Sequence, residues 1–318
     1  MASNIIIGEA LNELWHMRER GVGHEFDCIV TSPPYFGLRD YGMPGQLGLE
    51  ETVEEYVAKL VDILRAAREL LRSDGTLWLN LGDTYANTGT GGNGATGGLD
   101  KSTLSGHMPP VGTTPVKRRV PLGLKEKDLI GIPWRVAFAL QADGWYLRQD
   151  IIWSKPNPMP ESVTDRCVKS HEHVFLLSRE PRYYFDHEIM REPAVSGARG
   201  STFTKGKTGG HQGGRAGKGE RREDGMRNRR DVWSIATQPY KGAHFAVFPE
   251  KLAELCLRAG SRWGGWVLDP FAGSGTTLGV AEQFGRNGVG IELNPEYRKL
   301  IEERIRKGAK LALGASLN

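Results

Sequence analysis

Cysteine is scarce in this 318-residue chain: Cys28, Cys167 and Cys256 are its three copies, and no two of them form a CxxC pair. Their wide spacing argues against a disulfide framework or a zinc site, so no metal is expected and a reducing cytoplasm is the expected compartment. No run of about eighteen apolar residues occurs, which argues against a membrane span. The N-terminus lacks a basic segment followed by a long apolar one, so we expect no secretory signal.

The usual nucleotide-binding glycine motifs are missing from the clearest strand–loop–helix junction, VLDPFAGSGTT (267–277). It contains neither GxGxxG nor GK[ST], which disfavours a dinucleotide site or a P-loop. Gly273 and Gly275 still let the backbone approach a ligand and direct helix N-terminal N–H groups at it. Asp269 ends the first strand, and Glu292 ends the next one 23 residues later, where a ribose would find an acceptor. A carboxylate at 269 suits an ammonium group and repels phosphate, so the pattern favours a nucleoside with a positively charged tail.

The net charge of +4 is unevenly distributed. Residues 196–230 contain ten Lys or Arg and three Asp or Glu, a balance of +7, and the rest of the chain carries −3. Such a segment predicts a contact surface for a polyanion, with a solvated loop as the plain alternative. The candidate contacts are Arg199, Lys205, Lys207, Arg215, Arg221, Arg222, Arg227, Arg229 and Arg230.

Helices and strands alternate at both ends of the chain, which predicts a parallel α/β sheet covered by helices on both faces. Apolar residues at helical spacing in 51–75 predict an amphipathic helix that ends at Asp74–Gly75. Two glycine-rich stretches, one over 86–115 and one within the basic segment, are expected to be insertions at the rim. The expected strands are 4–7, 26–30, 76–83, 145–154, 173–179, 266–269 and 288–293.

The stretch TSPPY (31–35) follows the expected strand FDCIV and ends it with two prolines, which have no N–H for a ladder. TSPPY together with DPFAGSGTT resembles the motifs of the S-adenosylmethionine-dependent DNA amino-methyltransferases, which act on the N4 of cytosine or the N6 of adenine. The resemblance covers most of the chain. The motif order, with SPPY first, a basic segment in the middle and DPFAGSGTT last, is similar to that of the circularly permuted β class.

This resemblance implies a class I, Rossmann-like α/β fold with a mainly parallel seven-stranded sheet and helices on both faces. It implies S-adenosylmethionine as the cofactor and double-stranded DNA as the partner, and it admits a homodimer and a cognate restriction endonuclease. The implied organisation is one domain in three parts. They are a catalytic half over 1–185 with the glycine-rich loop 86–115, a target-recognition insertion over 186–232, and a cofactor-binding half over 233–318.

The resemblance also assigns the site residues. Its catalytic motif falls on Ser32, Pro33, Pro34 and Tyr35. Its cofactor-binding motifs fall on Glu9, His244, Phe245, Asp269, Pro270, Phe271, Gly273, Ser274, Gly275, Thr276 and Glu292. The Gly8–Glu9 pair departs from the Gly-Asp of many relatives, so a longer side chain must fit beside the cofactor's adenine.

The TSPPY motif suits the chemistry of an exocyclic amine, which is a poor nucleophile because its lone pair is delocalised into the ring. Acceptors that hold its N–H groups localise the lone pair and take up developing positive charge, and Ser32 Oγ and the Pro33 carbonyl can do this. The target base must leave the duplex, and the Tyr35 ring offers a stacking platform. Stacking needs the ring face alone, so Tyr35→Phe is expected to be mild. In this family SPPY leans toward N4-cytosine, with N6-adenine as the alternative.

Other polar residues have weaker signals. Lys155, Asn157 and Glu161 lie in a proline-stiffened loop and are candidates for the base pocket, with a rigid surface loop as the equal alternative. The stretch HEH (171–173) offers two histidines and no third ligand, which favours a structural or DNA-facing pair over a metal site. A catalytically dead nucleic-acid-binding module and a nicotinamide dehydrogenase are further alternatives. The intact SPPY motif disfavours the first, and the missing GxGxxG disfavours the second.

Overall fold

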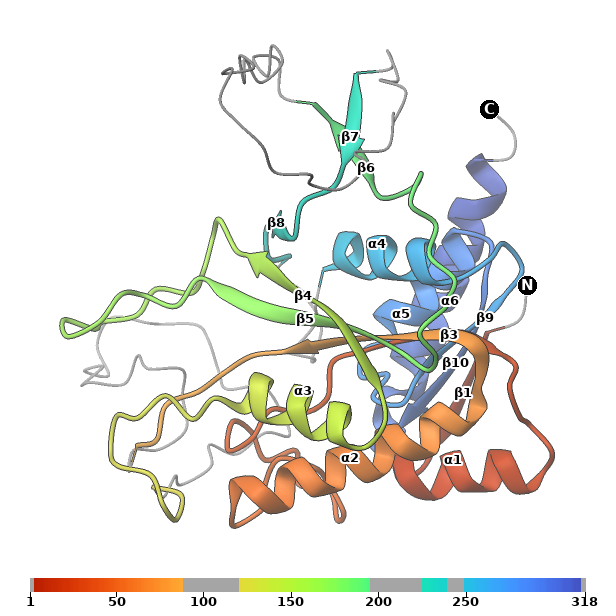
Figure 1. The fold of residues 1–318 in the computed structure, drawn as a ribbon. Helices are drawn as coiled ribbons and strands as arrows, with labels where there is room; N and C mark the ends of the chain where they lie inside the picture. Colours follow the sequence, from red (N-terminus) through yellow and green to blue (C-terminus); the bar gives the residue numbers. More distant parts are fainter. Residues whose placement is uncertain (1–2, 88–119, 195–224, 239–248, 316–318) are drawn as a thin grey trace, which may run out of the picture.

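The computed structural model describes residues 3–87, 120–194, 225–238 and 249–315 (Figure 1). In these ranges eight strands form one sheet. In sheet order they are β1 (Ser3–Ile7), β10 (Asn287–Glu292), β9 (Trp266–Asp269), β2 (Phe26–Thr31), β3 (Leu71–Leu81), β5 (His171–Ser178), β4 (Tyr146–Ser154) and β8 (Val232–Ser234). β5 runs antiparallel to both of its neighbours, and the other neighbouring pairs are parallel.

The predicted fold class, a mainly parallel α/β sheet, is confirmed, with one strand more than the seven expected. The additional strand is β8, which pairs in parallel with β4 and lies across the expected boundary at residue 232. Its middle residue, Trp233, is buried and lies 6.4 Å from the ring of Trp78. Three residues are too few to show the alternation that identifies a strand in a sequence.

The two ends of the chain meet in the sheet. β1 pairs in parallel with β10, so Ile7 lies opposite Glu292. The first strand thereby extends the part of the sheet that the last two strands build, and β2, which carries SPPY at its end, lies beside β9. This is the arrangement that the permuted motif order implies.

Helices cover both faces of the sheet (Figure 1). One face carries α1 (Ala10–Glu19), α2 (Val53–Leu70) and α3 (Ile132–Ala142), and the other carries α4 (Glu250–Gly260), α5 (Thr276–Gln283) and α6 (Arg298–Ala315). A short 3-10 helix (Pro295–Tyr297) immediately precedes α6. Each face has its own hydrophobic core: along β3, Leu77 and Leu79 join the first and Trp78 joins the second, as alternation on a strand requires. Among the described helices, none has the length and apolar character that crossing a membrane needs.

The long helix predicted over 51–75 ends earlier than its sequence indicates. Leu71 is already extended, with φ −72° and ψ 145°. The predicted end at Asp74–Gly75 is wrong, because both residues lie inside β3. Leu71 pairs with Phe26 on β2 and is fully buried, so the chain already belongs to the sheet where the local pattern would continue the helix.

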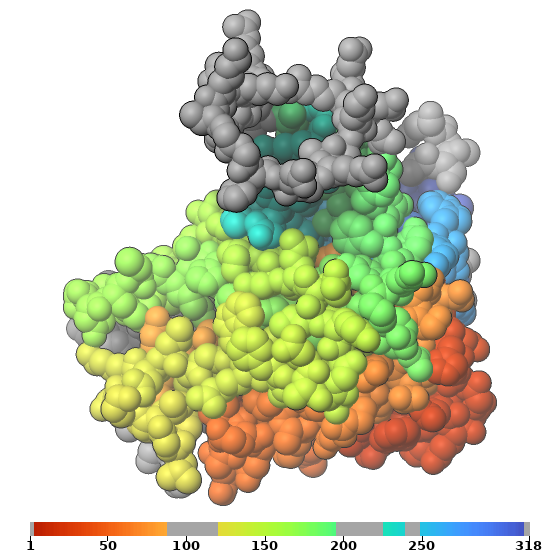
Figure 2. All heavy atoms as spheres, in the orientation of Figure 1, coloured from red at the N-terminus to blue at the C-terminus, as the bar shows by residue number. Residues whose placement is uncertain are grey.

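The predicted recognition insertion contributes a hairpin to the described structure. β6 (Arg191–Pro193) and β7 (Met226–Asn228) pair in antiparallel orientation. They stand beyond β8 at one end of the molecule, away from the layer of α1, α2 and α3 (Figures 1 and 2). Residues 195–224, which contain Arg199, Lys205, Lys207, Arg215, Arg221 and Arg222, lie outside the described residues, as do most of the loop 86–115 and the pair His244 and Phe245.

Candidate active site

SPPY and the DPFAGSG loop leave the sheet side by side, because β2 and β9 are neighbouring parallel strands. A hydrogen bond joins the two motifs: Thr31 Oγ1, immediately before Ser32, donates to Asp269 Oδ1 at 2.7 Å. Both side chains are buried. The fold therefore brings the two predicted motifs together at one edge of the sheet, in direct contact.

Asp269 is a buried carboxylate that forms hydrogen bonds but no ion pair within the described residues. Its Oδ1 also accepts from the backbone N–H of Phe271 at 3.1 Å, and the side chain is only 1% exposed. Burial raises the pKa of this carboxyl to about 6, although the hydrogen bonds from Thr31, Thr277 and Phe271 oppose the shift. A buried carboxylate that forms no ion pair within the described residues is stabilised when a cation or a further hydrogen-bond donor reaches it.

Glu292 stands at the next strand end in a similar state. Gly273 N donates to its Oε2 and Asn294 N to its Oε1, both at 2.8 Å. Burial raises its pKa to about 7, and the charge of Asp269 adds to the shift. Burial also raises the phenol pKa values of Tyr41 and Tyr297, and the nearby charge of Glu292 contributes to both. No local sequence pattern relates residue 41 or residue 297 to a binding site, so neither tyrosine is among the predicted site residues.

Residues of α6 pack against the glycine loop 270–276 and bind its hydroxyl groups. Gly275 has φ +79° and is the N-cap of α5, and an added Cβ would lie 2.8 Å from Ile301 Cγ2, so only glycine fits. Arg304 donates to Ser274 Oγ at 2.9 Å and also to the Thr276 hydroxyl. The hydroxyls of the loop thus bind the protein itself, and Pro270 is buried beneath them. The loop presents its backbone to the edge of the sheet.

In the SPPY motif, the two oxygens predicted to accept hydrogen bonds from the target amine have no close donor within the described residues. Ser32 Oγ has one contact among the described residues, a long one of 3.5 Å to Tyr35 Oη. The Pro34 carbonyl accepts from Tyr56 Oη at 2.9 Å, which ties the motif to the buried face of α2. The Pro33 carbonyl accepts no hydrogen bond from any residue in the described ranges. Ser32 Oγ and the Pro33 oxygen are the pair predicted from the sequence.

Tyr35 has a partner for its hydroxyl as well as a place for its ring. The hydroxyl donates to Glu172 Oε2 at 2.7 Å. An added Cβ at Gly82 would lie 2.6 Å from Tyr35 Cε2, so the ring rests directly on this glycine. Asn80 Nδ2 donates to the same Glu172 oxygen at 3.0 Å, and Lys155 binds the other oxygen. The sequence marked Lys155 as a candidate for the pocket, but it gave no role to Asn80 or Glu172.

Three other candidates have local partners. Glu9 caps α1, accepting from Leu11 N at 3.0 Å and from Asn12 N at 2.9 Å. Asn157 exchanges hydrogen bonds with Thr237, and Glu161 pairs with Arg166 at 2.7 Å. These contacts fix the loop around Asn157 and Glu161, in keeping with the rigid-loop alternative. In the described ranges no group of three His, Cys, Asp or Glu side chains could hold a metal ion.

Three arginines of the recognition segment, Arg227, Arg229 and Arg230, share one carboxylate. Glu192 on β6 pairs with Arg227 at 2.9 Å, with Arg229 at 3.6 Å and with Arg230 at 3.8 Å. The side chain of Arg230 is 69% exposed, against 32% for Arg227 and 23% for Arg229. Arg230 is therefore the one of the three that is best placed to leave Glu192 for an external phosphate.

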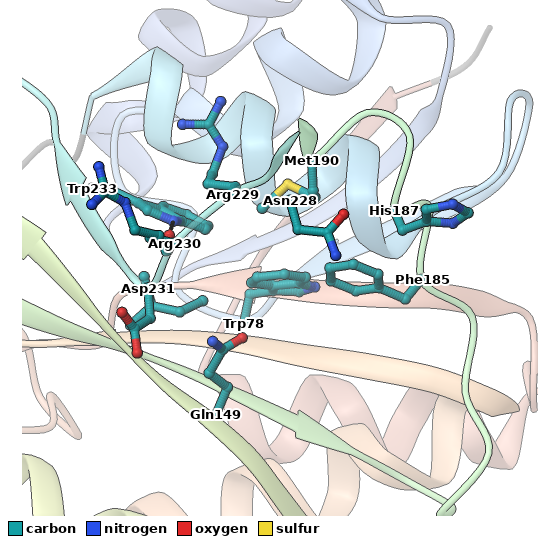
Figure 3. A pocket seen from close by; sticks show the side chains of 11 residues that line it. Trp78, Gln149, Phe185, His187, Met190, Asn228, Arg229, Arg230, Asp231 and Trp233 are labelled. Atoms are coloured by element: carbon teal, nitrogen blue, oxygen red, sulfur yellow. Dashed lines mark hydrogen bonds between the residues drawn. The ribbon is translucent and has the colours of Figure 1, made fainter. Parts of the chain in front are cut away.

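A cavity of about 140 Å³ lies between the recognition segment and the sheet (Figure 3). Trp78 and Phe185 stack at 6.2 Å on its floor, and Met190 and Asn228 lie above them. Its lining residues are Trp78, Gln149, Ile151, Phe185, His187, Met190, Asn228, Arg229, Arg230, Asp231 and Trp233. None of the predicted catalytic or cofactor residues is among them, so the cavity belongs to the junction that seats the hairpin on β3, β4 and β8.

Comparison with solved structures agrees with this fold. The PvuII DNA methyltransferase (cytosine-N4-specific) matches with a TM-score of 0.61 at 18% identity, covering 98% of this chain and 92% of that chain. A putative DNA modification methylase from Thermus thermophilus, complexed with S-adenosyl-L-methionine, matches with a TM-score of 0.59 at 21% identity, covering 96% and 94%.

Sequence comparison reaches closer relatives. The chain is 48% identical over 302 residues to the type II methyltransferase M.SmaI of Serratia marcescens, covering 95% of this chain and 90% of the relative. It is 46% identical over 298 residues to the type II methyltransferase M.Cfr9I of Citrobacter freundii, covering 94% and 86%. The sequence profile of a family described as DNA methylase matches residues 26–303. The chain therefore belongs to the DNA methylase family of N6- and N4-specific amino-methyltransferases.

Proposed function

We propose that this DNA methylase methylates the N4 amino group of cytosine at a specific site in double-stranded DNA. The single observation that carries the proposal is the contact between its two motifs. The 2.7 Å bond from Thr31 to Asp269 joins SPPY, proposed to hold the base, to the carboxylate proposed to hold the cofactor, and this contact supports a common site. Alignment of acceptor and methyl donor in one site is what an in-line methyl transfer requires.

The family's cofactor, S-adenosylmethionine, supplies a methyl group activated by its positively charged sulfur. The two raised carboxyl pKa values fit this molecule, because each carboxylate gains from a ligand that brings donors. We assign Asp269 to the ammonium end and Glu292 to the ribose hydroxyls. The rings of Tyr41 and Tyr297, which lie near Glu292, are available to the adenine.

The chain's own catalytic work is to hold the target amine. Ser32 Oγ and the Pro33 carbonyl accept its two N–H groups, which directs the nitrogen lone pair away from the ring. When the methyl group passes from the sulfonium to the amine, the sulfur would keep the bonding electron pair as a neutral thioether. The N–H proton oriented by Ser32 Oγ would be lost to water. Pro34 cannot compete for the Pro33 carbonyl because its nitrogen has no hydrogen, and the Pro34 carbonyl is already taken by Tyr56.

Cytosine is favoured over adenine by the length of the residue at position 32. Serine places its oxygen closer to the backbone than aspartate or asparagine does, which suits an amine on a smaller ring that enters further. The N6 of adenine is the alternative. Digestion of DNA methylated by the purified protein, followed by mass spectrometry of the nucleosides, is expected to give N4-methylcytosine. Finding N6-methyladenine alone would refute the cytosine assignment, and finding 5-methylcytosine would refute the amino-methyltransferase mechanism.

We infer that the insertion 186–232 contacts the DNA and that Arg230 binds a phosphate. Replacing Arg230 with alanine should lower the slope of log affinity against log salt by about 0.9, the contribution of one phosphate contact. Arg229→Ala is the matched control, since this side chain is 23% exposed, so the slope should change little. Equal slopes for wild type and Arg230→Ala in filter binding or anisotropy would place the contact elsewhere. A homodimer and a cognate restriction endonuclease stay predictions.

A further inference from the structure

We infer that Glu172 is a positioning residue that sets the orientation of the Tyr35 ring through its hydroxyl. The inference rests on the proposed function, since it concerns the ring on which the flipped base stacks. It adds a residue that neither of the two sequence motifs contains. Glu172 lies on β5, and 137 residues separate it from Tyr35.

Three strands converge on the Glu172 carboxylate. Asn80 reaches it from β3 at 3.0 Å, and Lys155 reaches it from the end of β4. Tyr35, beyond the end of β2, completes the set at 2.7 Å. Asn80 Nδ2 also donates to the His173 carbonyl at 3.1 Å, so the amide is fixed on β5 as well. The carboxylate is therefore immobilised before any base arrives.

The charge of this group is retained despite its position. The side chains of Glu172 and Lys155 are 12% and 18% exposed. Burial pushes the pKa of Glu172 up, but the Lys155 ammonium and the three hydrogen bonds outweigh it, so the pKa lies below its ordinary value. A hydrogen bond from a phenol to an ionised carboxylate is stronger and more directional than one between neutral groups. Burial and the Glu172 charge also keep the phenol protonated, because both raise the pKa of Tyr35.

The consequence is a ring held at two points. The ring packs against Gly82 around its Cε2 atom, and its hydroxyl donates to Glu172. Stacking alone predicts that Tyr35→Phe is mild, because the ring face survives. The hydrogen bond to Glu172 predicts a larger loss of kcat for Tyr35→Phe. Without its hydroxyl the ring can rotate or tilt, and a small misplacement in an active site lowers the rate strongly.

A double-mutant cycle on kcat tests this role. Glu172→Gln and Tyr35→Phe are each expected to lower kcat for DNA methylation about 10- to 100-fold. The double variant should have a kcat within about twofold of that of the slower single variant, since both changes act on the same bond: phenylalanine removes its donor, and glutamine leaves only a neutral, weaker acceptor. Cofactor affinity, measured by calorimetry without DNA, should stay within about twofold in all three variants.

Two further variants separate an effect on stability from an effect on the position of the Tyr35 ring. Glu172→Gln leaves the Lys155 ammonium unpaired and can destabilise the fold, so Glu172→Gln/Lys155→Met removes both charges together. Its melting temperature should recover while its kcat stays low. Glu254→Gln is the matched control, because Glu254 is also a largely buried carboxylate, 15% exposed, that pairs with two cations, Lys251 and Arg258 on α4. It should keep wild-type kcat.

Three results would overturn the inference. They are a wild-type kcat in Glu172→Gln, fold-losses that multiply in the cycle, and recovery of kcat together with stability in Glu172→Gln/Lys155→Met. Absence of any methylated base with the wild-type protein is a separate result. It overturns the proposed function and, with it, the role of Glu172.

Discussion

Replacing Ser32 with alanine is expected to lower kcat about 10²- to 10³-fold and to leave cofactor affinity unchanged. Ser32 Oγ has only a long 3.5 Å contact to Tyr35 within the described residues, so its lone pairs are available to the target amine. Alanine leaves the Pro33 carbonyl as the sole acceptor, and the positive charge that develops on nitrogen loses half of its stabilisation.

Single-turnover kinetics with excess enzyme isolates the chemical step for this comparison. Ser234→Ala is a matched control, since Ser234 is an exposed serine at the same end of the sheet, opposite Ser154 on β4. Its rate should equal that of the wild type. A Ser32→Ala rate within about threefold of wild type would remove the hydroxyl from the mechanism, because an acceptor used in the transition state is worth far more.

Much of the site was predictable because parallel strands bring their carboxyl ends to one edge. A reader of the sequence can place TSPPY after one strand and Asp269 and Glu292 after two others, and the sheet then assembles them. The alternation of helices and strands gives the fold class, and the resemblance to the amino-methyltransferases implies the permuted order. The contact between Thr31 and Asp269 follows from the pairing of β2 with β9, which the structure shows.

The hydrogen bonds that hold the Tyr35 hydroxyl could not be predicted in this way. Glu172 is the middle residue of HEH, and the two flanking histidines suggest a metal site or a structural pair but assign no role to Glu172. Its real partners, Asn80 and Lys155, come from two other strands, and only the pairing of β5 between β3 and β4 brings them together. The antiparallel insertion of β5 has no local signature, since its hydrophobic run reads like the run of a parallel strand.

Competition for polar groups limits sequence prediction elsewhere. The carboxylate of Glu9 is used by the first backbone N–H groups of α1, a capping role that any acidic residue before a helix can take. Arg227, Arg229 and Arg230 count as three positive charges in the sequence, but Glu192 neutralises part of that charge in the fold. A charge tally cannot see a pairing across 35 residues.

Cofactor binding is expected to weaken about 10²- to 10³-fold as the pH falls from about 8 to about 5. In the unliganded protein the pKa of Asp269 is about 6 and that of Glu292 about 7, so both are largely protonated at pH 5. The ammonium and ribose hydroxyls need the ionised carboxylates. Binding must therefore release protons at low pH, and calorimetry in buffers of different ionisation enthalpy measures that release directly.

The two carboxyls act on folding in the opposite direction. Their pKa values lie above the ordinary values of 3.8 and 4.5, so the stability they contribute is fully present below pH 4 and is lost as the pH rises through about 6 and 7. The part of the melting temperature that depends on these groups should fall from pH 5 to pH 8 without cofactor. With saturating cofactor this trend should shrink or reverse.

Glu292→Gln separates the two contributions to this behaviour. The amide cannot ionise, so the pH dependence of cofactor affinity should lose its component near pH 7 and keep the one near pH 6 that belongs to Asp269. The affinity at pH 8 should fall as well, because a neutral oxygen is a weaker acceptor for the ribose hydroxyls than a carboxylate. An affinity that is flat from pH 5 to pH 8 in the wild type would show that neither carboxyl changes its protonation on binding. The ammonium would then have to be held by a group other than Asp269.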